Sequence, residues 1–135
     1  MTGTAPTLRD AIGVAAITAI VTDFYHCAFV DPLISHFFIN SDMQHLITEQ
    51  TAFSEQLLQG SGDYRGRPLP VIHRPLAIRL VHFRRRQVLL HEAMMRAGLA
   101  GDLAARWLGL EERLKNVVVA DLISDCRHHD HGKPD

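Results

Sequence analysis

The sequence contains few cysteines and no long hydrophobic run. Cys27 and Cys126 are the only cysteines, and they form no C-x-x-C pair. Neither a disulfide framework nor a cysteine zinc site is therefore supported, and Cys27 is expected to be a small buried apolar residue. No apolar stretch approaches the roughly 18 to 20 residues that span a bilayer. These absences predict an unexported protein of the reducing cytoplasm, without a membrane span.

The chain also lacks an excess of charge of either sign. Fourteen Lys and Arg against fifteen Asp and Glu give a net charge of −1. Such a balance provides no positive field for a phosphate backbone, so we expect no nucleic-acid partner. The length of 135 residues, 47% of them hydrophobic, suits a single domain over residues 1–135. We expect its core at about residues 8–124 and a polar, His-rich tail at 125–135.

The hydrophobic pattern is helical along most of the chain. Apolar residues recur at steps of three and four over residues 12–28, 43–57, 79–97 and 102–124. Asp31-Pro32 is expected to open a short helical turn, and Ser41 to Gln44 have the spacing of a capping box. Glycines and prolines between residues 60 and 70 predict a loop. Because no alternating strand pattern occurs, the predicted class is all-α.

Three polar residues stand where burial is expected. Tyr25 and Gln50 interrupt apolar stripes, and His73 follows the Gly/Pro loop. Each alone is more often a satisfied structural residue. Together, in a cavity between helices, they suit a planar apolar cofactor, because an imidazole opposite hydrogen-bond donors is the layout of a haem site. The apolar residues expected to line that cavity are Phe24, Phe38, Phe53, Leu57 and Phe83.

Several short motifs in order resemble the truncated globins, group I more than group III, over about residues 8–122. They are Phe24-Tyr25, Asp31-Pro32-Leu33, Phe37-Phe38, Asp42-Met43 followed by Gln50 and Phe53, Gly62-Asp63-Tyr64-Arg65-Gly66, and His73 with Ile78, His82 and Phe83. The resemblance implies a truncated globin-like helical sandwich that encloses a haem pocket. It also implies haem b as cofactor and reversible binding of oxygen, nitric oxide or carbon monoxide. Nitric oxide dioxygenase activity, supported by an electron-donating reductase, is a further option within the family.

The resemblance also assigns roles to individual residues. His73 matches the proximal iron ligand, and Tyr25 and Gln50 match the pair that donates hydrogen bonds to the distal ligand. Leu46 matches the distal gate and cannot coordinate iron. Arg74 is a candidate partner of a haem propionate. The remaining pocket positions match Phe24, Phe38, Phe53, Tyr64, Ile72, Leu76, Ile78 and Phe83.

Two residues leave alternatives open. Arg86 stands where the family has an apolar residue or Trp facing the haem, so either the helix is rotated or the Arg reaches a propionate or the cavity. His45 is either solvated or turned toward the haem, as a propionate contact or a sixth ligand. A different class of function also fits the same apolar stripes: a non-haem helical interaction or metal-binding module. Burial of Tyr25 together with Gln50 argues against it, because unpaired buried polar groups cost about 1 to 3 kcal/mol each.

Overall fold

The computed structural model describes residues 6–60 and 79–114, and within these ranges the chain is helical with no strand. The elements are α1 (Leu8–Ile12), α2 (Val14–Ala28), the 3-10 helix η1 (Ser35–Phe38), α3 (Met43–Leu58) and α5 (Leu80–Arg96). Residues 101–114 form a further helical segment. The predicted all-α class is confirmed.

The first helix is interrupted, where the sequence pattern predicted one continuous helix from residue 12. Gly13 separates α1 from α2 with a φ of 94°, a conformation that residues with a side chain rarely adopt. The Thr7 hydroxyl accepts a hydrogen bond from the Asp10 amide at 3.0 Å and so caps α1. The helix predicted over residues 12–28 is thus confirmed over Val14–Ala28 and begins two residues late, because a single glycine introduces a break that the apolar stripe crosses.

The two predicted helix starts after α2 are each displaced. Asp31 does not cap a helix that begins at Pro32; its carboxylate accepts the Leu33 amide at 3.0 Å within a turn, and helical structure begins at Ser35. The cap of α3 is Asp42, whose carboxylate accepts the Gln44 amide at 3.0 Å, and not Ser41. The aspartate adjacent to the helix takes the capping position, since it offers an ionised acceptor near the positive helix end.

The boundaries of α5 agree with the sequence prediction. The Arg79 amide donates to His82 Nδ1 at 3.2 Å at the start of the helix. At its end Gly98 takes a φ of 75°, and the Leu99 amide donates to the Met94 carbonyl at 3.1 Å. This left-handed glycine closes the helix and turns the chain into the segment 101–114.

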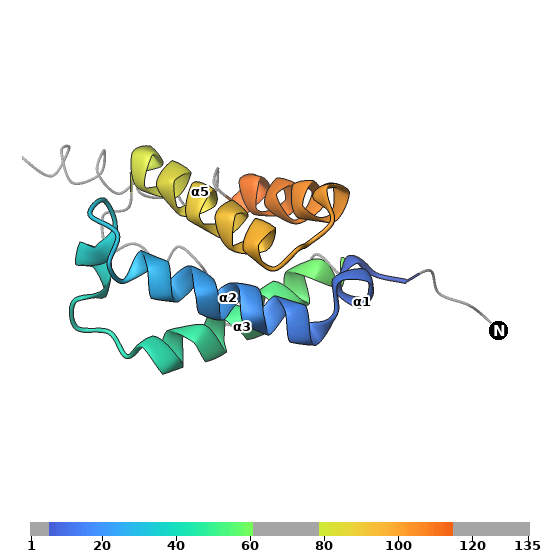
Figure 1. Ribbon diagram of the computed structural model, residues 1–135, viewed down its shortest axis with the longest axis horizontal. Helices are drawn as coiled ribbons and strands as arrows, with labels where there is room; N and C mark the ends of the chain where they lie inside the picture. The colour runs from blue at the N-terminus through green and yellow to red at the C-terminus, as the bar shows by residue number, and fades with distance from the viewer. Residues whose placement is uncertain (1–5, 61–78, 115–135) are drawn as a thin grey trace, which may run out of the picture.

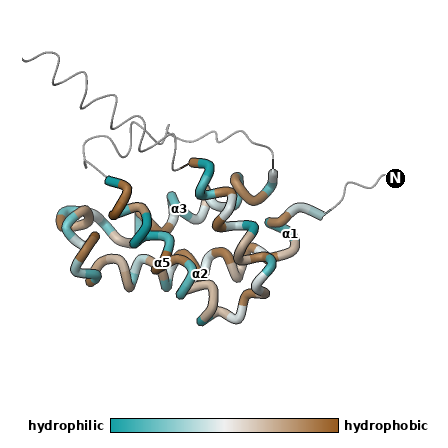
Figure 2. The backbone as a smooth tube through the Cα atoms, turned by 90° about the horizontal axis from the view of Figure 1, so that it is seen from above, coloured by the Kyte–Doolittle hydropathy of each residue, from teal (hydrophilic) through white to brown (hydrophobic). Residues whose placement is uncertain are grey.

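The core lies between α2, α3 and α5. Figure 1 shows α2 and α3 crossing on one side of the molecule, with α5 and the segment 101–114 covering them on the other. Along the helices hydrophobic and hydrophilic residues alternate in short stretches (Figure 2), as expected where each helix buries one side. The most fully buried large side chains include Trp107, Ile17, Ile20, Leu58 and Met94.

Some predictions fall outside the described residues. These are the Gly/Pro loop beyond residue 60, the last part of the helix predicted to residue 124, and the tail at 125–135. Among the helices of the described ranges, none has the length and apolar character needed to cross a membrane.

Candidate functional site

Tyr25 lies at the centre of a group of aromatic rings near the C-terminal end of α2. Its side chain is 8% exposed. Its ring meets Phe24, Phe38 and Phe29 edge-on, with centroid separations of 5.0, 5.9 and 6.2 Å. Phe29 in turn stacks on Phe38 at 4.9 Å. The structure thus brings together three predicted pocket residues, Phe24, Tyr25 and Phe38. Their rings meet in the T-shaped arrangement that aromatic pairs prefer.

The Tyr25 hydroxyl makes no hydrogen bond within the part of the chain that the structure describes. A buried tyrosine usually finds a partner for this group. Burial raises the pKa of Tyr25 to about 12, while the positive charge of Arg86 acts in the opposite direction. The hydroxyl is therefore protonated at neutral pH. It can donate a hydrogen bond to an acceptor that is not one of the described residues.

The α3 side of the site carries Gln50, Leu46 and Phe53. Gln50 is half-buried, and its Nε2 donates to the Ser54 hydroxyl one turn later through a long bond of 3.4 Å. Phe53 is buried, and Leu46 is half-buried against the core. The amide of Gln50 is held so weakly that it can turn toward a better acceptor.

Arg86 of α5 points inward and forms an ion pair that the sequence alone did not indicate. Its NH1 nitrogen donates to Glu111 Oε1, and also to Gln87 Oε1 at 2.7 Å. The other carboxylate oxygen of Glu111 accepts the indole N–H of Trp107 at 3.3 Å. The Glu111 side chain is only 3% exposed, whereas that of Arg86 is 22% exposed. Of the alternatives left open for Arg86, the inward orientation is the one observed, with Glu111 as its partner.

The guanidinium of Arg86 also faces the aromatic group. Its central carbon lies 5.4 Å from the centroid of the Phe24 ring, within the range of a cation–π contact. Burial disfavours its charge, yet the attraction to Glu111 and the hydrogen bond that Arg86 donates to it outweigh this and raise the pKa of Arg86 above its usual range. Arg86 is therefore a permanent positive charge beside Phe24.

Three residues of this arrangement were not predicted as site residues: Phe29, Trp107 and Glu111. Phe29 follows Tyr25 by four residues, and Glu111 follows Trp107 by four, so each pair lies on one face of a helix. That spacing was a usable signal for both. The pairing of Glu111 with Arg86, 25 positions away, left no local signal.

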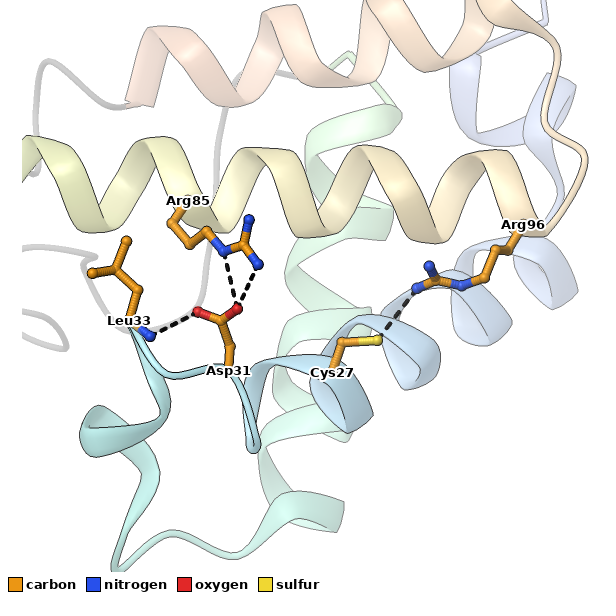
Figure 3. Close-up of polar contacts among 5 residues, drawn as sticks. All are labelled: Cys27, Asp31, Leu33, Arg85 and Arg96. Carbon is orange, nitrogen blue, oxygen red and sulfur yellow. Dashed lines mark hydrogen bonds and ion pairs between the residues drawn. The ribbon is translucent and has the colours of Figure 1, made fainter.

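Polar contacts join α5 to α2 and to the turn that follows α2 (Figure 3). In the second turn of α5, Arg85 donates from Nε and NH2 to a single oxygen of the buried Asp31. At the C-terminal end of α5, Arg96 donates to Asp23 at 2.8 Å and to the sulfur of Cys27 at 3.3 Å. Cys27 is thus half-buried beside a cation, which corrects the prediction of a small buried apolar residue. The order of these contacts along the two helices makes α5 antiparallel to α2, and Arg86 of α5 lies beside Phe24.

The remaining predicted residues divide into two sets. Phe83 is buried on α5. The His45 side chain is 60% exposed and lies 3.4 Å from Glu49, so the solvated alternative is the one observed. Within 6–60 and 79–114 no group of three or more His, Cys, Asp or Glu residues is arranged to hold a metal. The residues that lie outside the described ranges are His73, Tyr64, Ile72, Arg74, Leu76 and Ile78.

Comparison with known proteins decides the family. A family model described as bacterial-like globin matches residues 7–120. The chain belongs to this globin family. A group 1 truncated hemoglobin from Nostoc is 31% identical over 114 residues, which cover 84% of this chain and 97% of that protein. The predicted relationship to group I truncated globins is confirmed.

Other relatives agree with this assignment. A group 1 truncated hemoglobin from Tetrahymena pyriformis is 35% identical over 53% of this chain, and one from Tetrahymena thermophila is 32% identical over 58%. These two alignments span 59% and 65% of the relatives' own lengths. The crystal structure of the Tetrahymena pyriformis truncated hemoglobin in its Fe(III) form superimposes with a TM-score of 0.75 at 26% identity, covering 82% of this chain and 95% of that one.

A Synechococcus 2/2 hemoglobin, solved in the cyanomet state with covalently attached heme, has the same fold. It superimposes with a TM-score of 0.78 at 23% identity over 84% of this chain and 98% of that one. The truncated globin-like fold of this chain is thereby confirmed.

The described residues of this globin fit a haem. The buried Tyr25 carries a hydroxyl donor with no hydrogen bond among them, and rings of Phe24 and Phe38 adjoin the Tyr25 ring. A polar donor in an aromatic wall is what a porphyrin pocket with a distal ligand requires. The ligand and pocket roles of the individual residues stay predictions.

Proposed function

We propose that this globin binds haem b through His73 and thereby binds oxygen reversibly, with nitric oxide and carbon monoxide as alternative ligands. The observation that carries the proposal is the buried Tyr25, whose hydroxyl has no hydrogen bond in the described residues, in a chain that belongs to the globin family. Bound haem would supply the iron atom at which a diatomic ligand is held. The residues of the chain would supply the hydrogen-bond donors and the apolar side chains around that ligand.

Tyr25 would act as the principal hydrogen-bond donor to the ligand. Because burial raises its pKa to about 12, it keeps its proton throughout the physiological range. Gln50 would donate through Nε2, at the cost of its weak bond to Ser54. Both donors stand in surroundings of low polarity, where a hydrogen bond to a ligand with partial negative charge is stronger than in water.

Apolar side chains would exclude water from the ligand. Phe53 and Phe83 are buried, and Phe24 and Phe38 pack on Tyr25. Leu46, at the expected gate, has no atom that coordinates iron, so the position it occupies leaves the distal side open to a diatomic ligand.

We also propose that the protein is located in the cytoplasm, because of its composition and because the sequence has no disulfide framework.

A visible absorption spectrum of the purified protein, loaded with hemin where needed, tests the proposal. We expect a Soret band that shifts on reduction and again on addition of carbon monoxide. His73→Ala is expected to abolish stable haem binding, because it removes the proximal ligand. His45→Ala is the matched control, since it deletes an exposed imidazole, and it should keep the wild-type spectra.

Two results would contradict this assignment. A wild-type protein without a Soret band after loading would favour a helical interaction or metal-binding module. A normal ferrous carbonyl spectrum in His73→Ala would show that another residue holds the iron.

A further inference from the structure

We propose that Arg86 makes the ligand pocket selective for small monovalent anions, by turning the positive end of a buried ion pair toward Tyr25. The inference rests on the proposed function, since the anion would bind where the diatomic ligand does. It assigns a specificity-determining role to a residue whose position the family usually fills with an apolar side chain or Trp.

The Arg86–Glu111 ion pair is held in one direction. Two hydrogen bonds hold Glu111 in place. One of its oxygens accepts an N–H of Arg86, and the other accepts the indole N–H of Trp107, whose side chain is fully buried. Arg86 extends from this anchor to the Phe24 ring. The carboxylate is therefore fixed in the interior, and the guanidinium bonded to it contacts the aromatic group at Phe24.

The guanidinium of Arg86 has hydrogen-bonding capacity beyond its bonds to Glu111 and Gln87. Its hydrogen bonds to Glu111 and Gln87 both leave from NH1. In the described residues Nε and NH2 have no hydrogen-bond partner. Arg86 can thus neutralise Glu111 and still present N–H groups and charge to a second acceptor.

The charge of Arg86 also acts on Tyr25. Among the charges that act on the Tyr25 hydroxyl, Arg86 is the strongest and lowers its pKa, whereas Glu111 acts less strongly in the opposite direction. The Arg86–Glu111 pair therefore favours a negative charge close to Tyr25. The pair has no net charge, but its positive member acts on Tyr25 more strongly than its negative member. An anion beside the Tyr25 hydroxyl would experience the same field.

Azide binding to the ferric, haem-loaded protein tests this, with Arg86→Met/Glu111→Gln as the main variant. The double substitution removes both charges and leaves no buried charge unpaired. We expect its dissociation constant for azide to rise roughly tenfold, the effect of a charge several ångströms away at intermediate dielectric. Glu111→Gln alone keeps one acceptor oxygen, removes the negative charge and so unmasks the positive charge of Arg86, and it should bind azide more tightly than wild type.

The matched control is Arg84→Met/Glu112→Gln. It removes one charge of each sign from the same two helical segments, at an ion pair of 3.5 Å whose Arg84 side chain is 57% exposed. Its azide affinity should equal that of wild type within twofold. Carbon monoxide affinity should also stay within about threefold in all variants, since that ligand is neutral.

A vibrational readout separates the field from ligand affinity. Positive charge near bound carbon monoxide lowers the C–O stretching frequency, so the frequency should rise in Arg86→Met/Glu111→Gln and fall in Glu111→Gln. If the first variant does not fold, the second still tests the sign of both effects. Unchanged azide affinity and stretching frequency in a haem-loaded protein would overturn the role of Arg86. A wild-type chain that takes up no haem would overturn the proposed function and this inference with it.

Discussion

Arg85 of α5 donates two hydrogen bonds to the same carboxylate oxygen of Asp31, at 3.0 Å from Nε and 2.7 Å from NH2. The second oxygen of Asp31 accepts the Leu33 amide at 3.0 Å. One side chain thereby fixes the turn after α2 and joins it to a helix 54 positions later (Figure 3). The turn leads directly into η1, which carries Phe38 to the Tyr25 ring.

Asp31→Asn should lower the free energy of unfolding by about 2 kcal/mol, because it removes the charge from hydrogen bonds made by a buried carboxylate. The partial exposure of Arg85 moderates the loss. Urea unfolding followed by circular dichroism measures it. Arg84→Gln, at an exposed ion pair, is the control and should change stability by less than about 1 kcal/mol. Equal effects of the two substitutions would contradict a special role for Asp31.

The same contact predicts an acid-sensitive contribution to stability. The hydrogen bond from Arg85 is the main cause that lowers the pKa of Asp31 below its ordinary value of 3.8. A carboxyl with a depressed folded pKa stabilises the fold above its unfolded pKa, and this contribution is lost as the pH falls through the folded value. Wild type should therefore exceed Asp31→Asn in stability at pH 7, and the difference should shrink below about pH 4. A constant difference down to pH 2 would refute this.

Tyr25→Phe should affect ligand release more than stability. If Tyr25 donates to bound oxygen, its loss removes roughly 1.5 to 3 kcal/mol, and oxygen should dissociate roughly tenfold to a hundredfold faster. The hydroxyl has no hydrogen bond in the described residues, so the free energy of unfolding should change by less than about 0.5 kcal/mol. Flash photolysis and urea unfolding measure the two quantities. An unchanged dissociation rate would show that Tyr25 does not contact the ligand.

Two glycines should respond in opposite directions to alanine. Gly98 has a φ of 75° and no atom within 4 Å of an added Cβ, so Gly98→Ala should cost about 1 kcal/mol through backbone strain alone. Gly109 lies inside the helical segment 101–114, also with free space, and Gly109→Ala should stabilise by about 0.5 to 1 kcal/mol. Thermal unfolding of the two variants should bracket the wild type. Stabilisation by Gly98→Ala would exclude the strained turn.

The sequence by itself determined the helical class, both boundaries of α5 and the family, because these depend on local spacing. Apolar steps of three and four place one side of each helix in the core, and Gly98 marks the end of α5 through its own backbone freedom. The aromatic group around Tyr25 was also largely predictable, since Phe24 and Phe38 belong to recurring motifs. Phe29 shares a helical face with Tyr25 and was within reach of the same reasoning.

Tertiary structure alone decided how the charges pair. Arg84, Arg85 and Arg86 are consecutive in the chain, and nothing local distinguishes them. The helix directs Arg84 to Glu112 at the surface, Arg85 to Asp31 and Arg86 inward to Glu111. Successive residues of a helix point about 100° apart, so each arginine meets whatever the fold brings to its own side. The partners come from segments 25 to 54 positions away, and only packing of the helices sets those distances.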